Sequence, residues 1–210
     1  MADFKEDLQK ALAELRKNKE RKFNQSVDLI INLQKFDVKK SNVNFFVSVP
    51  HKIKEKKIGA FLETKNKNVE TITRTEFKKY SDKKELKKLV ENFDFFIAQA
   101  SVMPQVATTF GRALGPAGKM PSPQMGIVMD ADDKTINDLK NKINSNIRIK
   151  VKEPSIKLAV GKQNMKDEDI IENAIIVYNA IIKAMPRDKD NIKNVEIKFT
   201  MTKPQKIKVR

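Results

Sequence analysis

The sequence predicts a small α/β domain inserted into an α+β domain, and two observations support this fold class. In the middle of the chain, short apolar strands alternate with amphipathic helices, which is typical of a parallel sheet covered by helices. Both ends of the chain instead combine antiparallel-type strands with helices. The ends, residues 1–58 and 150–210, are therefore expected to fold together as one domain around an inserted domain of residues 59–149. A chain of 210 residues is long enough for both.

The N-terminal part begins with a predicted amphipathic helix over residues 3–17, because its apolar residues recur at helical spacing. Two strands are predicted over 27–33 and 43–49, which are rich in β-branched and apolar residues. The polar stretch 39–42 joins these strands, and residues 52–57 are interpreted as an exposed connector into the middle of the chain.

The middle of the chain is expected to contain strands over 58–62 and 95–98, and helices over 82–90, 101–114 and 132–143. Ser81 is a suitable N-cap for the first of these helices. Pro104 lies near the start of the second, where its missing N–H costs little. Acidic residues begin the third helix, which favours its macrodipole.

The last third of the chain predicts strands over 147–151, 156–160 and 195–201 and a helix over 167–185. A hairpin-like turn at residues 153–155 separates the first two strands. The helix has the strongest pattern in the chain, since acidic residues open it, a wide apolar face follows, and Pro186 ends it.

Composition narrows the class of protein. Lysine and arginine number 43 against 27 aspartate and glutamate, which gives a net charge of +16 spread along the whole chain. The hydrophobic content of 40% excludes a disordered polycation. We expect a soluble intracellular protein whose partner is a polyanion, most simply nucleic acid, although a solvated lysine-rich surface is the alternative. No signal peptide or membrane span is expected, and the absence of cysteine excludes disulfides and thiolate catalysis.

The segment 111–123 is rich in glycine and proline. A glycine-rich loop can bind phosphate through its backbone N–H groups. The spacing excludes a Walker loop, because Ala113 and Met120 stand where glycine and serine or threonine are required. The segment is interpreted as a rigid connector, on which Arg112 and Lys119 could also contact RNA phosphates.

The hypothesis that competes with nucleic-acid binding is that the chain is an α/β enzyme acting on a phosphorylated substrate. No pair of carboxylates and no nucleophile–base pair stands out, and a single histidine, His51, argues against a histidine-based metal site. Neither a metal nor a cofactor is therefore expected.

Two further segments combine features that suit RNA. Phe23 follows several cations and precedes small polar residues, so it could stack on a base while its neighbours contact phosphate and 2′-hydroxyl groups. A core phenylalanine at a strand start is the equally good alternative. Residues 200–204 at the last strand could likewise be a plain strand end.

Four stretches, in order along the chain, resemble the ribosomal protein L1 family. They are KFNQSVDLIINL (22–33), GRALGPAGKMP (111–121), KLAVGK (157–162) and TMTKP (200–204). The resemblance covers essentially the whole chain and is closer to the archaeal and eukaryotic branch than to the bacterial one.

The resemblance implies a discontinuous α+β first domain built from both chain ends and an inserted Rossmann-like α/β second domain without a nucleotide. It implies a cytoplasmic, non-enzymatic protein, a monomer within the ribosome, that binds large-subunit ribosomal RNA. There it would form the mobile stalk at the tRNA exit site and assist release of deacylated exit-site tRNA. It would also bind its own messenger RNA and repress translation. The alternative within the family is a non-ribosomal RNA-binding regulator or ribosome-biogenesis factor.

The resemblance also implies a set of RNA-binding residues from three strands of the first domain: Lys22, Phe23, Ser26, Gly161, Lys162, Thr200, Met201, Thr202, Lys203 and Pro204. Arg112 and Lys119 would make a secondary RNA contact or belong to an interdomain loop. Thr202 departs from the family, which usually has glycine there, so close approach of the backbone to RNA requires a compatible threonine conformation.

Overall fold

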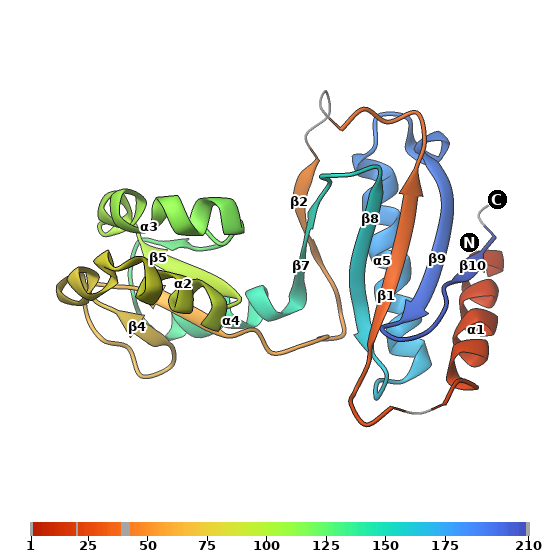
Figure 1. Cartoon of the computed structure of the whole chain (residues 1–210), viewed down its shortest axis with the longest axis horizontal. Helices are drawn as coiled ribbons and strands as arrows, with labels where there is room; N and C mark the ends of the chain where they lie inside the picture. The colour runs from red at the N-terminus through yellow and green to blue at the C-terminus, as the bar shows by residue number, and fades with distance from the viewer. Residues whose placement is uncertain (1, 20, 39–42, 209–210) are drawn as a thin grey trace. The chain divides into compact units, whose positions relative to one another are not determined.

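Strands from both ends of the chain pair in one antiparallel sheet in a computed structural model, which describes residues 2–19, 21–38 and 43–208 (Figure 1). The central strand β1 (Ser26–Leu33) lies between β8 (Ser155–Lys162) and β9 (Ile192–Phe199), and β10 (Gln205–Ile207) pairs with β9. The sheet order is therefore β10-β9-β1-β8. This pairing joins the two chain ends into one folded unit.

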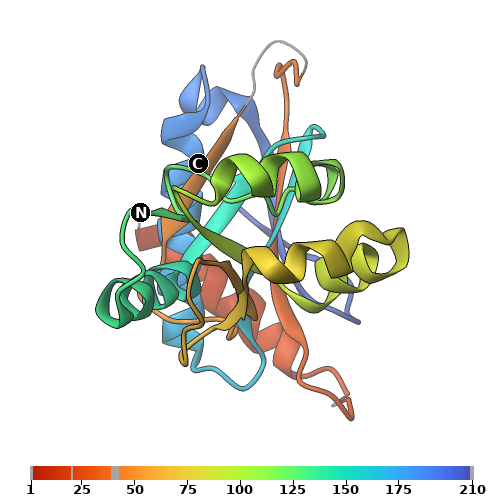
Figure 2. The ribbon, with the colours of Figure 1, turned by 90° about the vertical axis from the view of Figure 1, so that its left-hand side faces the viewer.

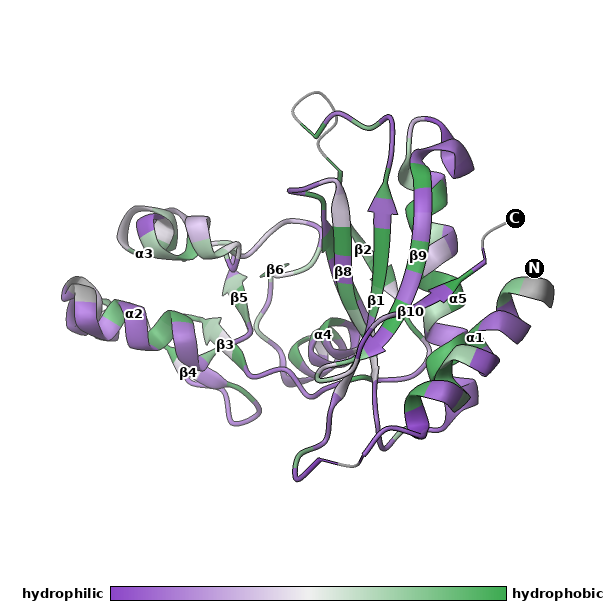
Figure 3. Cartoon of the chain, turned by 45° about the vertical axis from the view of Figure 1, so that its right-hand side comes forward, coloured by the Kyte–Doolittle hydropathy of each residue, from purple (hydrophilic) through white to green (hydrophobic). Residues whose placement is uncertain are grey.

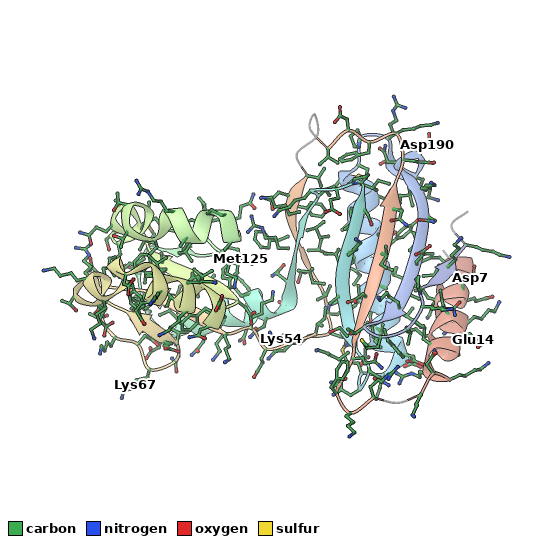
Figure 4. All side chains as sticks on the ribbon, in the orientation of Figure 1. Asp7, Glu14, Lys54, Lys67, Met125 and Asp190 are labelled. Carbon is green, nitrogen blue, oxygen red and sulfur yellow. The ribbon has the colours of Figure 1, made fainter. Side chains whose placement is uncertain are left out.

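Two helices cover one face of this sheet, α1 (Ala2–Arg16) and α5 (Asp167–Ala184). Burial alternates along β1, so that Val27, Leu29 and Ile31 point into the core that these helices share. The alternation is visible as bands of hydropathy along the strands in Figure 3. Glu14, labelled in Figure 4, lies on the exposed side of α1. The opposite face of the sheet carries no helix among the elements described for this unit.

A two-stranded sheet of β2 (Asn44–Ser48) and β7 (Asn146–Lys150) packs on the same core. The predicted hairpin of the strands around residues 153–155 is therefore wrong, because β7 pairs with β2 whereas β8 pairs with β1. The N–H of Leu33 donates to the Pro154 carbonyl at 2.8 Å, which fixes the turn to the end of β1. The polar stretch 39–42 lies outside the described residues.

The chain divides into two compact units, Met1–Ile53 with Ser145–Arg210 (unit 1) and Lys54–Asn144 (unit 2). Both boundaries lie five residues earlier than the sequence predicts. The reason is hydrogen bonding: β7 pairs within unit 1, whereas the Lys56 N–H donates to Asn144 Oδ1 at 3.0 Å within unit 2.

Unit 2 contains a parallel sheet of order β4-β3-β5-β6. Its strands are β3 (Ile58–Phe61), β4 (Glu70–Ile72), β5 (Phe95–Gln99) and β6 (Ile127–Val128). One face packs against the 3₁₀ helix η1 (Arg74–Ser81), α2 (Lys83–Asn92) and α3 (Met103–Ala117), and the other against α4 (Asp133–Ser145) (Figure 2). Each face has its own apolar cluster, so unit 2 has a core separate from that of unit 1.

Three details differ from the sequence prediction. Asp82, not Ser81, caps α2, since its carboxylate accepts from the Lys84 N–H at 3.2 Å. The short strands β4, β6 and β10 and the 3₁₀ helices, η1 and η2 (Asp188–Asn191), were not expected, because segments of two to eight residues carry too little periodicity.

No helix in the described part of the chain is long and apolar enough to cross a membrane.

Candidate RNA-binding surface

Three segments that are far apart in the sequence meet at one end of the unit 1 sheet. They are residues 22–26 before and at the start of β1, 161–163 at the end of β8, and 200–204 after β9; we call them the sheet-end surface. Ser26 is the register partner of Lys162. The Ser26 N–H donates to Thr200 Oγ1 at 3.0 Å, and the Thr200 N–H donates to the Ser26 carbonyl at 3.1 Å. The structure thus brings the predicted residues of unit 1 together.

The sheet-end surface exposes two large apolar side chains, Phe23 at 50% and Met201 at 58%. Within the described ranges only Met129 in unit 2 is comparable. Phe23 is therefore not a core residue, and the alternative interpretation of this position is wrong. Lys22 and Lys203 are exposed beside these side chains in the sequence, and Lys162 is half-buried. Exposed apolar side chains with cations next to them in the sequence can pack on sugars or bases while the cations attract phosphates.

Gln25 connects the three segments, although it was not among the residues selected from the sequence. Its side chain is only 2% exposed. The Gln25 Nε2 donates to Gln163 Oε1 at 3.2 Å, and its Oε1 accepts from the Met201 N–H at 3.0 Å. The Gln163 N–H donates to the Gln25 carbonyl at 2.8 Å. A glutamine in a polar stretch resembles a surface residue, so only the folded chain reveals this role.

Arg16 fixes the loop between β8 and α5 from the end of α1. Its guanidinium donates to Asp167 Oδ1 at 2.7 Å, to the Gln163 carbonyl at 3.1 Å and to the Met165 carbonyl at 3.0 Å. Planar guanidinium groups suit several acceptors at once. The loop that carries Gln163 is therefore held from both α1 and β1.

Gly161 is buried, and its identity follows from packing. A Cβ added there would lie 2.8 Å from Cγ1 of Ile170 on α5. The absence of a side chain at Gly161 therefore lets β8 lie close to α5.

Thr202 is accommodated without a left-handed backbone conformation, since it is not among the residues of positive φ. Its hydroxyl accepts from the Phe199 N–H at 2.9 Å, and its own N–H donates to the Phe199 carbonyl at 3.1 Å. Strand β9 consequently ends at Phe199 rather than at residue 201, and Thr200 and Met201 lie in a tight turn.

Known proteins are similar to this chain over most of its length. The model of the Ribosomal protein L1p/L10e family matches residues 15–203. The chain belongs to the ribosomal protein L1 family. It is 34% identical to the large ribosomal subunit protein uL1 of Nanoarchaeum equitans, over 89% of this chain and 92% of the relative. It is 33% identical to uL1 of Thermococcus kodakarensis, over 96% of each chain. As a ribosomal L1 protein, the chain is structural and not an enzyme.

The family-like segment GRALGPAGKMP lies in unit 2 and is largely helical, which corrects its interpretation as a connector. Helix α3 continues to Ala117, and Gly118 ends it with φ of 69°, a left-handed conformation that glycine adopts without strain. The Lys119 ammonium donates to the carbonyls of Val90 at 2.7 Å and Phe93 at 2.8 Å. Lys119 thus binds the carboxyl end of α2 rather than projecting toward a phosphate, whereas Arg112 is exposed on α3.

We expect Gln25→Met to weaken RNA binding by this ribosomal L1 protein. Methionine keeps the side-chain length but leaves the Met201 N–H without its acceptor, and loss of a typical hydrogen bond costs about 0.5–1.5 kcal/mol of stability. The sheet-end segments then lose their common anchor. RNA titration and thermal unfolding measure both effects.

Gln34→Met is the matched control. Gln34 Nε2 donates to the carbonyls of Asp190 and Ile192, each at 3.2 Å, beyond the other end of β1. This variant should lose some stability while retaining RNA affinity. Equal loss of affinity in both variants would show that Gln25 acts only through global stability.

Proposed function

We propose that this ribosomal L1 protein is a component of the large ribosomal subunit that binds large-subunit ribosomal RNA through the sheet-end surface. One observation carries the proposal: Phe23 and Met201, from opposite ends of the chain, are exposed at the place where three predicted RNA-binding segments converge. Burying them against a partner would remove their apolar surface from water.

The chemistry of this surface suits folded RNA. Ser26, Thr200 and Thr202 offer hydroxyls, and the neighbouring backbone offers polar groups, for contacts with 2′-hydroxyls. Phe23 and Met201 would pack on a base or a sugar, and Lys22, Lys162 and Lys203 would approach phosphates. Gly161 and Pro204 would contribute backbone and ring surface. We place Arg112 outside this surface, on unit 2.

The proposal extends to the place of the protein in the ribosome and to a second RNA partner. The bound RNA would be the mobile stalk at the tRNA exit site of cytoplasmic ribosomes, where one copy of the protein assists release of deacylated tRNA. A surface that recognises a folded RNA shape would also bind a similar fold in the protein's own messenger RNA, and so repress its translation.

Salt-dependent binding tests the proposal. With an isolated large-subunit RNA fragment, six phosphate contacts predict a slope of log K against log salt of roughly −4 to −5. The reason is that each neutralised phosphate releases counterions. Isothermal or filter-binding titrations over several salt concentrations give the slope. A slope near zero, or failure of the protein to sediment with large subunits in a moderate-salt gradient, would contradict the proposal.

A further inference from the structure

Methionine is the most easily oxidised residue type in this chain. The sequence contains 8 methionines but no cysteine and no tryptophan, so no thiol of the protein competes for an oxidant. Among the residues that the structure describes, Met129 in unit 2 and Met201 in the sheet-end surface are the exposed methionines, at 78% and 58%. The other described methionines are half-buried or buried. Because susceptibility follows exposure, oxidation is expected first at these two positions.

The backbone around Met201 is held by hydrogen bonds, whereas its side chain is open to water. The Met201 N–H donates to Gln25 Oε1 at 3.0 Å. The Thr202 N–H closes the turn that carries Met201, since it donates to the Phe199 carbonyl at 3.1 Å. The Met201 side chain does not belong to the apolar core of unit 1. A change in the chemistry of this side chain therefore alters the sheet-end surface and leaves the fold of unit 1 in place.

Oxidation converts the apolar Met201 side chain into a polar one. In the reaction with hydrogen peroxide, the thioether sulfur attacks one peroxide oxygen, so that a sulfur–oxygen bond forms and the oxygen–oxygen bond breaks. The sulfur loses two electrons, and the departing hydroxide takes the proton of the transferred oxygen and leaves as water. The product is a sulfoxide. Burying a polar group without a hydrogen-bond partner is unfavourable, so the sulfoxide opposes packing of this side chain on a base or a sugar.

We propose that Met201 is a reversible oxidation site, and that its sulfoxide weakens the binding of RNA to the sheet-end surface. This inference rests on the proposed function and adds regulation of the same surface. Reversal requires a thiol reductant: two thiols reduce the sulfoxide to the thioether, they are oxidised to a disulfide, and the oxygen leaves as water. Bound RNA covers the sulfur, so the free protein is the form that becomes oxidised.

A second methionine near this surface is shielded from oxidants. Met165 is half-buried and packs against the unit 1 core, and its sulfur accepts a hydrogen bond from the Lys162 N–H at 3.3 Å. Packing hinders an approaching peroxide, and the hydrogen bond engages a lone pair of the sulfur. Met165 should therefore be oxidised more slowly than Met201.

Mild treatment of the 210-residue chain with hydrogen peroxide tests the inference. Titration with the large-subunit RNA fragment before and after treatment gives the affinity, and peptide mass spectrometry gives the sulfoxide content of each methionine. Full conversion of Met201 should weaken binding about tenfold. The unfolding temperature should change little, because the side chain lies outside the unit 1 core. Methionine sulfoxide reductase with dithiothreitol should restore the affinity.

Two leucine variants separate Met201 from the other exposed methionine. Met201→Leu lacks the sulfur, so peroxide should leave its affinity at the value of the untreated variant. Met129→Leu is the matched control, and peroxide should lower its affinity as much as that of the wild type. The inference is wrong if wild-type protein with fully converted Met201 binds as tightly as before, or if Met201→Leu loses as much affinity as the wild type.

Oxidation rates in the complex test whether RNA covers the Met201 sulfur. With RNA at about ten times its dissociation constant, about 90% of the protein is bound, so Met201 should be oxidised about tenfold more slowly than in the free protein. Met129 should be oxidised at the same rate in both states. Equal rates at Met201 with and without bound RNA would overturn the inference. Failure of the untreated wild type to bind the fragment would instead refute the proposed function itself.

Discussion

Replacing Phe23 with alanine is expected to weaken binding to the ribosomal RNA fragment by about 1–3 kcal/mol, which corresponds to roughly 5- to 150-fold in affinity. The reason is that stacking on a base contributes this much, and half of the Phe23 side chain is exposed for it. The unfolding temperature should change little, because the ring is not part of the unit 1 core. Titration of the RNA fragment and thermal unfolding of the same preparation measure the two quantities.

Met129→Ala is the control for Phe23→Ala. Besides Phe23 and Met201, Met129 is the large apolar side chain that the described residues expose, at 78%, and it lies in unit 2. Its loss should leave RNA affinity unchanged. Wild-type affinity in a folded Phe23→Ala variant would remove Phe23 from the interface, and equal losses in both variants would indicate non-specific adhesion through exposed apolar surface.

The second large effect is expected in unit 2, where Phe61→Ala should reduce stability by about 3–5 kcal/mol. Phe61 is fully buried. Its ring stacks on Phe96 with centroids 5.3 Å apart and contacts Phe110 at 4.8 Å and Phe77 at 5.9 Å. Alanine would leave a cavity at the centre of this cluster. Chemical denaturation should show an earlier transition for unit 2.

RNA binding should survive this loss, because the sheet-end surface belongs to unit 1, whose core shares no residue with that of unit 2. Leu29→Ala provides the comparison. Leu29 is fully buried on β1, so this variant destabilises the unit that carries the surface and should weaken RNA binding under conditions where Phe61→Ala does not. Loss of binding in Phe61→Ala alone would place the RNA site in unit 2 and refute the proposed function.

Several residues of the candidate surface could be selected before the fold was known. Phe23, Ser26 and Thr200 came from segments that resemble the family, and the structure places them at one end of one sheet. Gln25 lies in one of the same segments but was not selected, and Arg16 lies outside them. Their roles depend on partners more than 130 residues away in the chain, and a glutamine or arginine in a polar segment has the same local pattern as a solvated one.

Lys119, in contrast, was selected from the sequence although the structure gives its side chain a structural role. A cation in a segment rich in glycine and proline is typical of a phosphate contact, yet its ammonium binds two carbonyls at the end of α2. The hairpin predicted around residues 153–155 failed for a related reason. Strand β7 finds its partner in β2, which precedes it by about 100 residues, and local turn residues cannot specify such a choice.

By itself, the sequence determined the types of most long elements, the division into two end segments and an inserted middle, and the basic charge. These properties follow from local periodicity and composition, which each segment carries alone. Only the tertiary structure decided which strands pair, and that Phe23 and Met201 are exposed at the sheet end that also carries Lys162. Pairing and burial are properties of distant residues brought together, because each strand satisfies its backbone hydrogen bonds and its apolar face only against the others.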